Sequence, residues 1–300
     1  MVMDISVVIP SYGAERTIEQ CLQNILSQTT SKPYEVIVCD SSPADEVQNI
    51  AKQYPIKFIK RTKKIPPGIA RNIGAESAQG ELLVFIDADI TLGPGALEEI
   101  WKYYQQGPEV FCIALDLGKG KKSFSSHIEH YLFFCEYQSG RKSGERKNLP
   151  STVFIIKKEL FFSFGGFKSY WRGEDTEFTE RISKAGKRPM FVSRIVAYRN
   201  QDVPLREIAG KNFKYGIYWG RKYFLEAKGL KKLTVVFLLP FLSLLKSTRI
   251  VCRNLIYDNM ADKCLSALLS PLLFLLGFWW VAGILAGLFS NIRDKEERSD

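Results

Sequence analysis

The stretch Leu82-Leu83-Val84-Phe85-Ile86-Asp87-Ala88-Asp89 is an apolar run that ends in two carboxylates one residue apart. A short continuous apolar run is typical of a strand that is buried on both faces. Side chains alternate along an extended chain, so Asp87 and Asp89 are expected to point the same way where the strand ends. Their charge calls for a cation or a polyol, and a divalent metal ion carrying a diphosphate would satisfy it. On this segment alone, a turn with solvated carboxylates explains the pattern equally well.

Strand and helix patterns alternate on the N-terminal side of this stretch. We predict strands at residues 5–10, 34–40, 56–60 and 81–87, with helices at 14–28, 45–54 and 69–79 between them. This order indicates a parallel sheet with right-handed crossovers, and such sheets bind ligands at the carboxyl ends of their strands. Asp40 ends the second strand, so it is expected in the same crevice as Asp87.

The pattern of the remaining chain divides it into two parts. Helices are predicted at residues 96–105, 158–164 and 174–185, and strands at 110–115 and 152–156. We expect residues 1–230 to form one α/β domain and residues 231–300 to form C-terminal hydrophobic helices that associate with a membrane. The polar, basic segment 139–147 is expected to be a loop.

Charge and hydropathy indicate a membrane partner. The formal net charge is +10, and residues 201–232 hold eight Lys and Arg against three acids. An apolar run at 233–245 follows, which is short and interrupted by Pro240, so a re-entrant helix and a tilted span are both open. Residues 264–289 carry no charge and are long enough to cross a bilayer. Basic residues beside apolar runs favour an anionic membrane surface over nucleic acid.

The six cysteines show neither a CxxC pair nor zinc-ligand spacing. Several lie inside apolar runs, where a small buried thiol is the usual explanation. We therefore expect reduced cysteines and a catalytic domain on the cytoplasmic face of a cell membrane. Residues 1–10 contain Asp4 and only short apolar runs before Pro10, so they predict a first strand and not a signal peptide.

Six short motifs occur in an order that resembles one enzyme family. They are VVIPSY at residues 7–12, EVIVCDSS at 35–42, ARNIG at 70–74, DAD at 87–89, GGF at 165–167 and GED at 173–175. Together they resemble the family 2 glycosyltransferases with the GT-A fold, which transfer a sugar from a nucleoside-diphosphate donor. The resemblance covers about residues 4–200 and implies an α/β fold with a central, mostly parallel sheet.

The resemblance also implies how the donor and a metal ion would be bound. Tyr12 would stack on the nucleotide base, and Asp40 would accept a hydrogen bond from a ring N–H such as uracil offers, which favours a UDP-sugar. Asp87 would bind the ribose or a metal-bound water, and Asp89 would hold Mg²⁺ or Mn²⁺ on the diphosphate. The implied nucleotide contacts are Pro10, Tyr12, Asp40, Arg71 and Asp87, and the implied metal ligands are Asp89, Asp87 and Asn200.

Two positions depart from the family pattern. Many relatives carry a metal-binding histidine after the last strand, where this chain has Arg199 and Asn200. Asn200 could supply an oxygen to the metal, or Arg199 could meet the diphosphate. Cys39 stands where relatives often have a further aspartate beside the residue equivalent to Asp40.

The catalytic residues implied by the resemblance are Asp175, as the general base that removes the acceptor's proton, and Glu174, which would orient the acceptor. One base and one displacement imply inversion at the anomeric carbon. The Gln-x-x-Arg-Trp motif of processive synthases is absent, which favours addition of a single sugar to a lipid-linked or saccharide acceptor. A polyprenyl-phosphate glycosyltransferase, which needs no base, and a non-catalytic membrane scaffold are the alternatives.

Overall fold

The computed structural model describes residues 3–118, 122–226, 230–257 and 260–289. Contacts along the chain divide it into two compact units. The first, called the sheet unit here, comprises residues 1–119 and 137–201, and the second, the helical unit, comprises 120–136 and 202–300. By these contacts the helix Leu205–Glu226 groups with the C-terminal helices, whereas the sequence placed it before a boundary at residue 230.

The first half of the sheet is parallel, as predicted. Strands β1 (Ile5–Ser11), β2 (Tyr34–Asp40), β3 (Lys57–Lys60) and β4 (Leu82–Ile86) lie in the order β3-β2-β1-β4. Helices α1 (Ile18–Leu26), α2 (Glu46–Ala51) and α3 (Pro67–Glu76) connect them. All five residues of β4 are buried, as its uninterrupted apolar sequence predicts.

The second half of the sheet is mixed, which the sequence pattern did not predict in detail. Strand β8 (Val153–Lys157) lies antiparallel between β4 and β6 (Val110–Leu117), and β9 (Met190–Arg199) is parallel to β6. The short strands β5 (Ile90–Leu92) and β7 (Gly144–Glu145) are antiparallel to β9. Three further helices belong to this half: α4 (Ala96–Tyr104), α6 (Lys158–Ser163) and α7 (Glu174–Lys184).

An aromatic cluster forms the core between β4, β8 and the helices α6 and α7. Phe167 of the GGF motif is buried in it, with its ring 5.0 Å from Phe178 and 5.6 Å from Phe85. Asn72 of α3 exchanges two hydrogen bonds with the backbone of Phe167, at 2.8 and 2.9 Å. The motif therefore fixes α3 to the segment that leads into α7.

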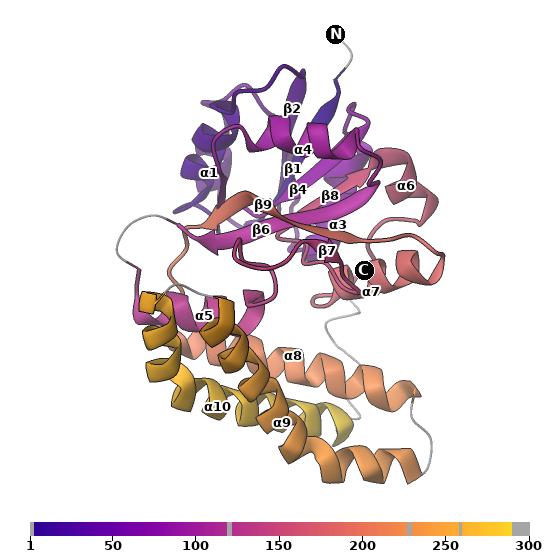
Figure 1. Ribbon diagram of the computed structural model, residues 1–300. Helices are drawn as coiled ribbons and strands as arrows, with labels where there is room; N and C mark the ends of the chain where they lie inside the picture. The colour runs from indigo at the N-terminus through magenta and orange to yellow at the C-terminus, as the bar shows by residue number, and fades with distance from the viewer. Residues whose placement is uncertain (1–2, 119–121, 227–229, 258–259, 290–300) are drawn as a thin grey trace. The chain divides into compact units, whose positions relative to one another are not determined.

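The helical unit contains α5 (Phe124–Phe134), α8 (Leu205–Glu226), α9 (Leu230–Tyr257) and α10 (Met260–Phe289). Helices α8 and α9 both pack along α10 (Figure 1). Helix α9 continues through Pro240, so the apolar run at 233–245 is part of a longer helix. Among the described helices, only the segment Lys263–Leu288 of α10 has the length and hydropathy needed to cross a bilayer.

Candidate active site

The carboxyl ends of the parallel strands gather the predicted donor-binding residues at one edge of the sheet. Ser11 is paired with Asp40, and Asp40 with Lys60, so Tyr12 and Asp40 follow or end neighbouring strands. Asp87 directly follows β4, and its backbone N–H donates to Thr152 at 3.0 Å, at the start of β8. The prediction that Asp40 and Asp87 lie at the same edge is therefore confirmed.

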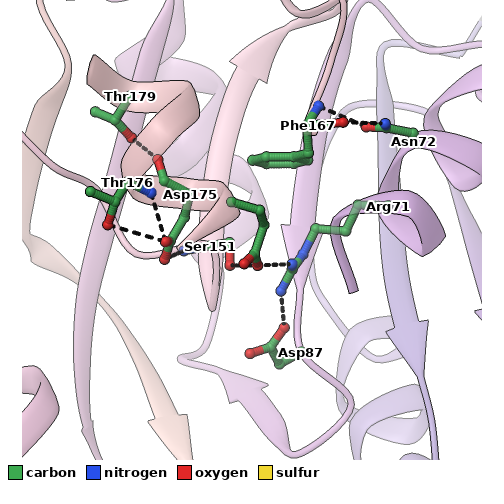
Figure 2. A network of polar contacts seen from close by, with 9 residues as sticks. Arg71, Asn72, Asp87, Ser151, Phe167, Asp175, Thr176 and Thr179 are labelled. Atoms are coloured by element: carbon green, nitrogen blue, oxygen red, sulfur yellow. Dashed lines mark hydrogen bonds and ion pairs between the residues drawn. The ribbon is translucent and has the colours of Figure 1, made fainter. Parts of the chain in front are cut away.

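A buried arginine links two of the predicted acids. Arg71 is 2% exposed, and its guanidinium donates to Asp87 Oδ1 at 2.6 Å and to Glu174 Oε1 at 3.0 Å. Ser151 Oγ also donates to Glu174 Oε1, at 3.3 Å. Figure 2 shows Arg71 and Asp87 in this network, with Asp175 beside it. Arg71 thus joins the end of β4 to the start of α7, although Glu174 lies 103 residues from Arg71 along the chain.

Two glycines of α3 allow the close packing that makes this link possible. A Cβ added at Gly68, in the first turn of α3, would lie 3.0 Å from Glu174 Cγ and 2.9 Å from Phe167 Cβ. A Cβ at Gly74 would clash with the side chain of Val8 on β1. The absence of side chains at these two positions lets α3 lie against the sheet and lets Glu174 reach Arg71.

Asp175 is held in a fixed orientation at the start of α7. Its Oδ2 accepts a hydrogen bond from the Ser151 backbone N–H at 3.2 Å, and its Oδ1 accepts one from the Thr176 N–H at 2.6 Å. Figure 2 shows both contacts. Acidic residues are also favoured in the first turn of a helix by the helix dipole. The carboxylate is therefore positioned beside the Arg71 network without belonging to it.

The protonation of the network is set by burial and by its unequal numbers of charges. Burial, followed by the charge of Asp175, raises the pKa of Glu174 to about 7, although Arg71 opposes the shift. Burial also raises the pKa of Asp87, and again Arg71 opposes it. Arg71 does not fully compensate the two carboxylates that it contacts, so a proton or a further cation is favoured here.

Asp89, the second acid of the motif, is paired with an arginine at the end of the last strand. Arg199 at the end of β9 lies 3.2 Å from Asp89 Oδ2, and both side chains are largely buried. The pairing of Ile90 with Arg199 in the sheet brings the two together. Arg199 also lies near enough to Asp87 to oppose the rise in the pKa of that carboxyl.

Asn200, the third predicted metal ligand, neighbours Asp89 through its backbone. Its N–H donates to the Asp89 carbonyl at 3.0 Å, but its side-chain amide donates to Thr91 Oγ1 at 2.9 Å and its side-chain oxygen packs against Gly118. Within the described ranges, no three His, Cys, Asp or Glu side chains are grouped closely enough to hold a metal ion. Asp87 and Asp89 fit a hard cation that takes its other ligands from phosphate and water.

Asp40, the predicted base contact at the end of β2, is held by two neighbouring side chains. It is fully buried, its Oδ1 accepts a hydrogen bond from Ser42 Oγ at 2.6 Å, and its Oδ2 lies 3.1 Å from Lys60 Nζ. Ser42 in turn accepts a hydrogen bond from the Gly13 N–H at 2.9 Å. In this arrangement Asp40 has no surface open to a ligand and holds the loop after β1 in place.

Tyr12 is the exposed member of the predicted nucleotide contacts. It is 49% exposed, and Lys64 Nζ lies 4.2 Å from the centre of its ring. The same ammonium lies 5.4 Å from the centre of the Trp171 ring, in the segment before α7. Pro10 is paired with Cys39 inside the sheet. Tyr12 thus has an aromatic face available for stacking, and at present it contacts a lysine.

Comparison with known families identifies the chain. Residues 6–173 match the family model described as glycosyl transferase family 2. The chain belongs to this family. It is therefore a glycosyltransferase, and the fold and enzyme class expected from the six motifs are confirmed.

Characterised relatives share moderate identity with the chain. It is 26% identical over 225 residues to the glycosyltransferase AglE of Haloferax volcanii, covering 71% of each protein. It is 28% identical over 172 residues to a dolichol-phosphate mannosyltransferase of Pyrococcus furiosus, covering 53% of this chain and 47% of the relative.

Solved structures show the same GT-A fold at low sequence identity. The mannosyltransferase PcManGT from Pyrobaculum calidifontis, in complex with GDP-Man and Mn²⁺, superposes with a TM-score of 0.63 at 17% identity. That match covers 96% of this chain and 88% of the other. Staphylococcus aureus TarS with UDP-GlcNAc gives a TM-score of 0.52 at 17% identity, covering 95% and 90%.

Several site residues were not found by sequence reasoning. Ser151 contacts both Glu174 and Asp175, and Lys64 lies over Tyr12. Lys60 and Ser42 hold Asp40. Lys60 ends a predicted strand, and Ser42 and Lys64 lie in the loops after predicted strands, which was the available signal; Ser151 directly precedes the predicted strand 152–156. Their partners, however, are set by tertiary packing.

Proposed function

We propose that this glycosyltransferase moves a sugar from a nucleoside-diphosphate donor, with a UDP-sugar favoured, to a hydroxyl group, with inversion at the anomeric carbon. The observation that carries the proposal is Asp175, held by Ser151 and Thr176 beside the buried network of Arg71, Asp87 and Glu174. The donors named in the PcManGT and TarS structures support a nucleotide-sugar.

The donor side would be built from the end of β1 and the DAD motif. Tyr12 offers its exposed ring to the base, while Asp87 and Asp89 would hold Mg²⁺ or Mn²⁺ on the diphosphate. The bound ion would stabilise the negative charge that develops on the leaving diphosphate. Arg199 lies beside Asp89, where it can add a positive charge to the same phosphate oxygens.

The acceptor side would be built from the start of α7. Asp175 would take the proton from the acceptor hydroxyl as the oxygen attacks the anomeric carbon. Glu174, fixed by Arg71 and Ser151, would orient the acceptor and keep the segment before α7 in place.

A phosphate acceptor is the second candidate, and one observation favours it. The relative from Pyrococcus furiosus is a dolichol-phosphate mannosyltransferase, and a phosphate nucleophile needs no base. The helical unit, with its long apolar helix, supports action at a membrane in either case. We propose that the site faces the cytoplasm and takes a lipid-linked or saccharide acceptor.

Replacement of Asp175 by Asn separates the candidates. We expect a loss of transfer to hydroxyl acceptors of about 10²- to 10⁴-fold, because a general base contributes about this much. Nucleotide binding should be the same in the variant and the native protein. It is measured as the rise in melting temperature caused by UDP, GDP, CDP or dTDP, each with and without Mn²⁺. Glu159→Gln changes an exposed acid on α6 and serves as the control.

The three outcomes are distinct. Near-normal transfer by Asp175→Asn, measured with a polyprenyl phosphate, would support the phosphate acceptor. Absence of transfer from every nucleotide-sugar by the unmodified chain, despite folding, would support a non-catalytic scaffold.

A further inference from the structure

We propose that α8, α9 and α10 form a monotopic layer, in which α10 lies within one leaflet of an anionic bilayer and does not cross it. The inference rests on the membrane association proposed above and specifies its geometry. By length and hydropathy alone, Lys263–Leu288 could cross a bilayer. The helices that pack against this segment argue otherwise.

Helix α8 runs parallel to α10 in a constant register. Asn212 Nδ2 donates to the Leu276 carbonyl at 2.5 Å, which pairs positions 64 residues apart. A Cβ on Gly216 would clash with the carbonyl of Trp280, and one on Gly220 would meet Ile284, which gives the same offset. The backbones therefore touch along three turns, and α8 has to share the depth of α10.

This register places charge at the level of the midpoint of α10. The same offset puts Lys211 level with residue 275 and Lys214 level with residue 278, near the middle of Lys263–Leu288. Lys211 is paired with the buried Glu129 of α5 at 2.9 Å, whereas Lys214 is exposed. A spanning α10 would hold Lys214 within about 4 Å of the bilayer midplane, given 1.5 Å per residue.

The cost of that placement is large enough to decide between the two geometries. A lysine near the bilayer centre costs about 2.5–3.5 kcal/mol even on the mildest scale. The interface lies about 15 Å from the midplane, which is beyond the reach of a lysine side chain. A layer that lies in the interface leaves Lys214 among headgroups at no such cost.

Helix α9 repeats the pattern in the antiparallel direction. Ser247 Oγ donates to the Leu273 carbonyl at 3.3 Å, and Leu239 packs with Val281 and Ile284. Arg249 is therefore level with the first half of the apolar segment, and its side chain is 66% exposed. Charged side chains thus accompany α10 from both neighbours.

The same two helices present apolar stripes that are otherwise unexplained. On α9, Phe237, Phe241 and Leu245 follow a spacing of four residues and are 75%, 57% and 66% exposed. On α10, Leu268 and Leu275 are 71% and 65% exposed. Apolar exposure on one part of a helical layer, with cations beside it, is typical of helices that lie in the membrane interface.

Charge complementarity selects an anionic bilayer as the partner of these stripes. Helix α8 has five Lys and Arg against two Glu, and α9 has five Lys and Arg and no acid. Basic residues near an anionic membrane surface add about 1 kcal/mol each to binding. A second protein copy would meet the same cations and be repelled by them.

The test asks on which side of the membrane each end of α10 lies. The full chain is expressed with Cys252→Ser and Cys264→Ser, which removes the two exposed native thiols. Single reporter thiols are then introduced by Lys263→Cys, before the apolar segment, and by a cysteine appended after Asp300. Lys184→Cys, on α7, reports the side of the sheet unit. Sealed membrane vesicles of both orientations are treated with a membrane-impermeant maleimide.

We expect all three thiols to react in the same vesicle orientation. The proposal is overturned if the Lys263→Cys thiol reacts from the opposite side, or only after detergent is added, or if the appended thiol does. Recovery of the chain as a soluble oligomer would remove the membrane association itself while leaving sugar transfer intact, so the two failures can be told apart.

Discussion

At the scale of the residue, the protonation of Glu174, which Arg71 contacts, determines how the site contributes to stability at different pH values. Glu174 is enclosed, and its pKa is raised to about 7. The ordinary pKa of a glutamate is about 4.3, so the folded protein retains a proton that the unfolded chain has released. Between these two values the contribution of Glu174 to stability falls as pH rises, and above about 7 it is constant.

Glu174→Gln should remove this pH dependence. We expect the unfolding free energy of the native protein to drop between pH 5 and pH 8, relative to the variant, by on the order of 2 kcal/mol. Urea unfolding of both proteins at the two pH values measures the difference. Glu159→Gln should follow the native protein, and parallel curves for Glu174→Gln and the native protein would contradict the assignment.

Arg199 and a divalent ion compete for the same oxygens of Asp89. Because Arg199 lies 3.2 Å from Asp89 Oδ2, Arg199→Gln should strengthen binding of Mn²⁺ in the absence of nucleotide by several-fold. Asp89→Asn should weaken it. Calorimetric titration of the folded proteins provides the dissociation constants. An unchanged constant for Arg199→Gln would show that the ion binds elsewhere.

Sequence reasoning located the acids but not their partners. The order of strands and helices predicted that Asp87 shares an edge of the sheet with Asp40, and that part is confirmed. It could not predict that Arg71 would be buried between Asp87 and Glu174, because those contacts join residues 16 and 103 positions apart. Only the packing of α3 at Gly68 and Gly74 brings them together.

At the scale of the element, close contact between α8 and α10 holds the helical unit together. Gly216→Val should destabilise the unit, because the new side chain would collide with the Trp280 carbonyl and force the helices apart. We expect a fall in Tm of several degrees in thermal melting of the full chain in lipid.

Gly210→Val is the matched control on the same helix. A Cβ at Gly210 meets nothing within 4 Å, so only the difference in helix propensity remains. Equal melting of the two variants would argue against the packing of α8 on α10.

Local patterns predicted the elements unequally. The helices and strands of the parallel half follow from periodicity, since strands and helices alternate there along the chain. The pairing of β8 with β4 depends on chain segments about 70 residues apart, and β5 has three residues, so neither leaves a periodic signal. Pro240 suggested an interruption because proline removes a helix hydrogen bond, yet α9 continues through it.

At the scale of the whole molecule, the exposed apolar stripes and the cations should act together in membrane binding. Phe241→Ser is expected to weaken binding to vesicles that contain phosphatidylglycerol by several-fold, because it removes apolar area from the stripe of α9. Raising the salt concentration should weaken binding of the native chain as well. Vesicle flotation measures both effects.

Phe162→Ser is the control, since Phe162 is 40% exposed but lies on α6 of the sheet unit. Equal weakening by both changes would mean that the stripe of α9 has no special role.

The single arginine shared by Asp87 and Glu174 also has a kinetic consequence. If a donor complex takes over Asp87, the guanidinium of Arg71 would be left to neutralise Glu174 alone. We therefore expect ordered binding in which the donor comes first and the acceptor second. Such an order would protect the activated sugar from wasteful hydrolysis, because Asp175 would meet the acceptor only when both reactants are bound.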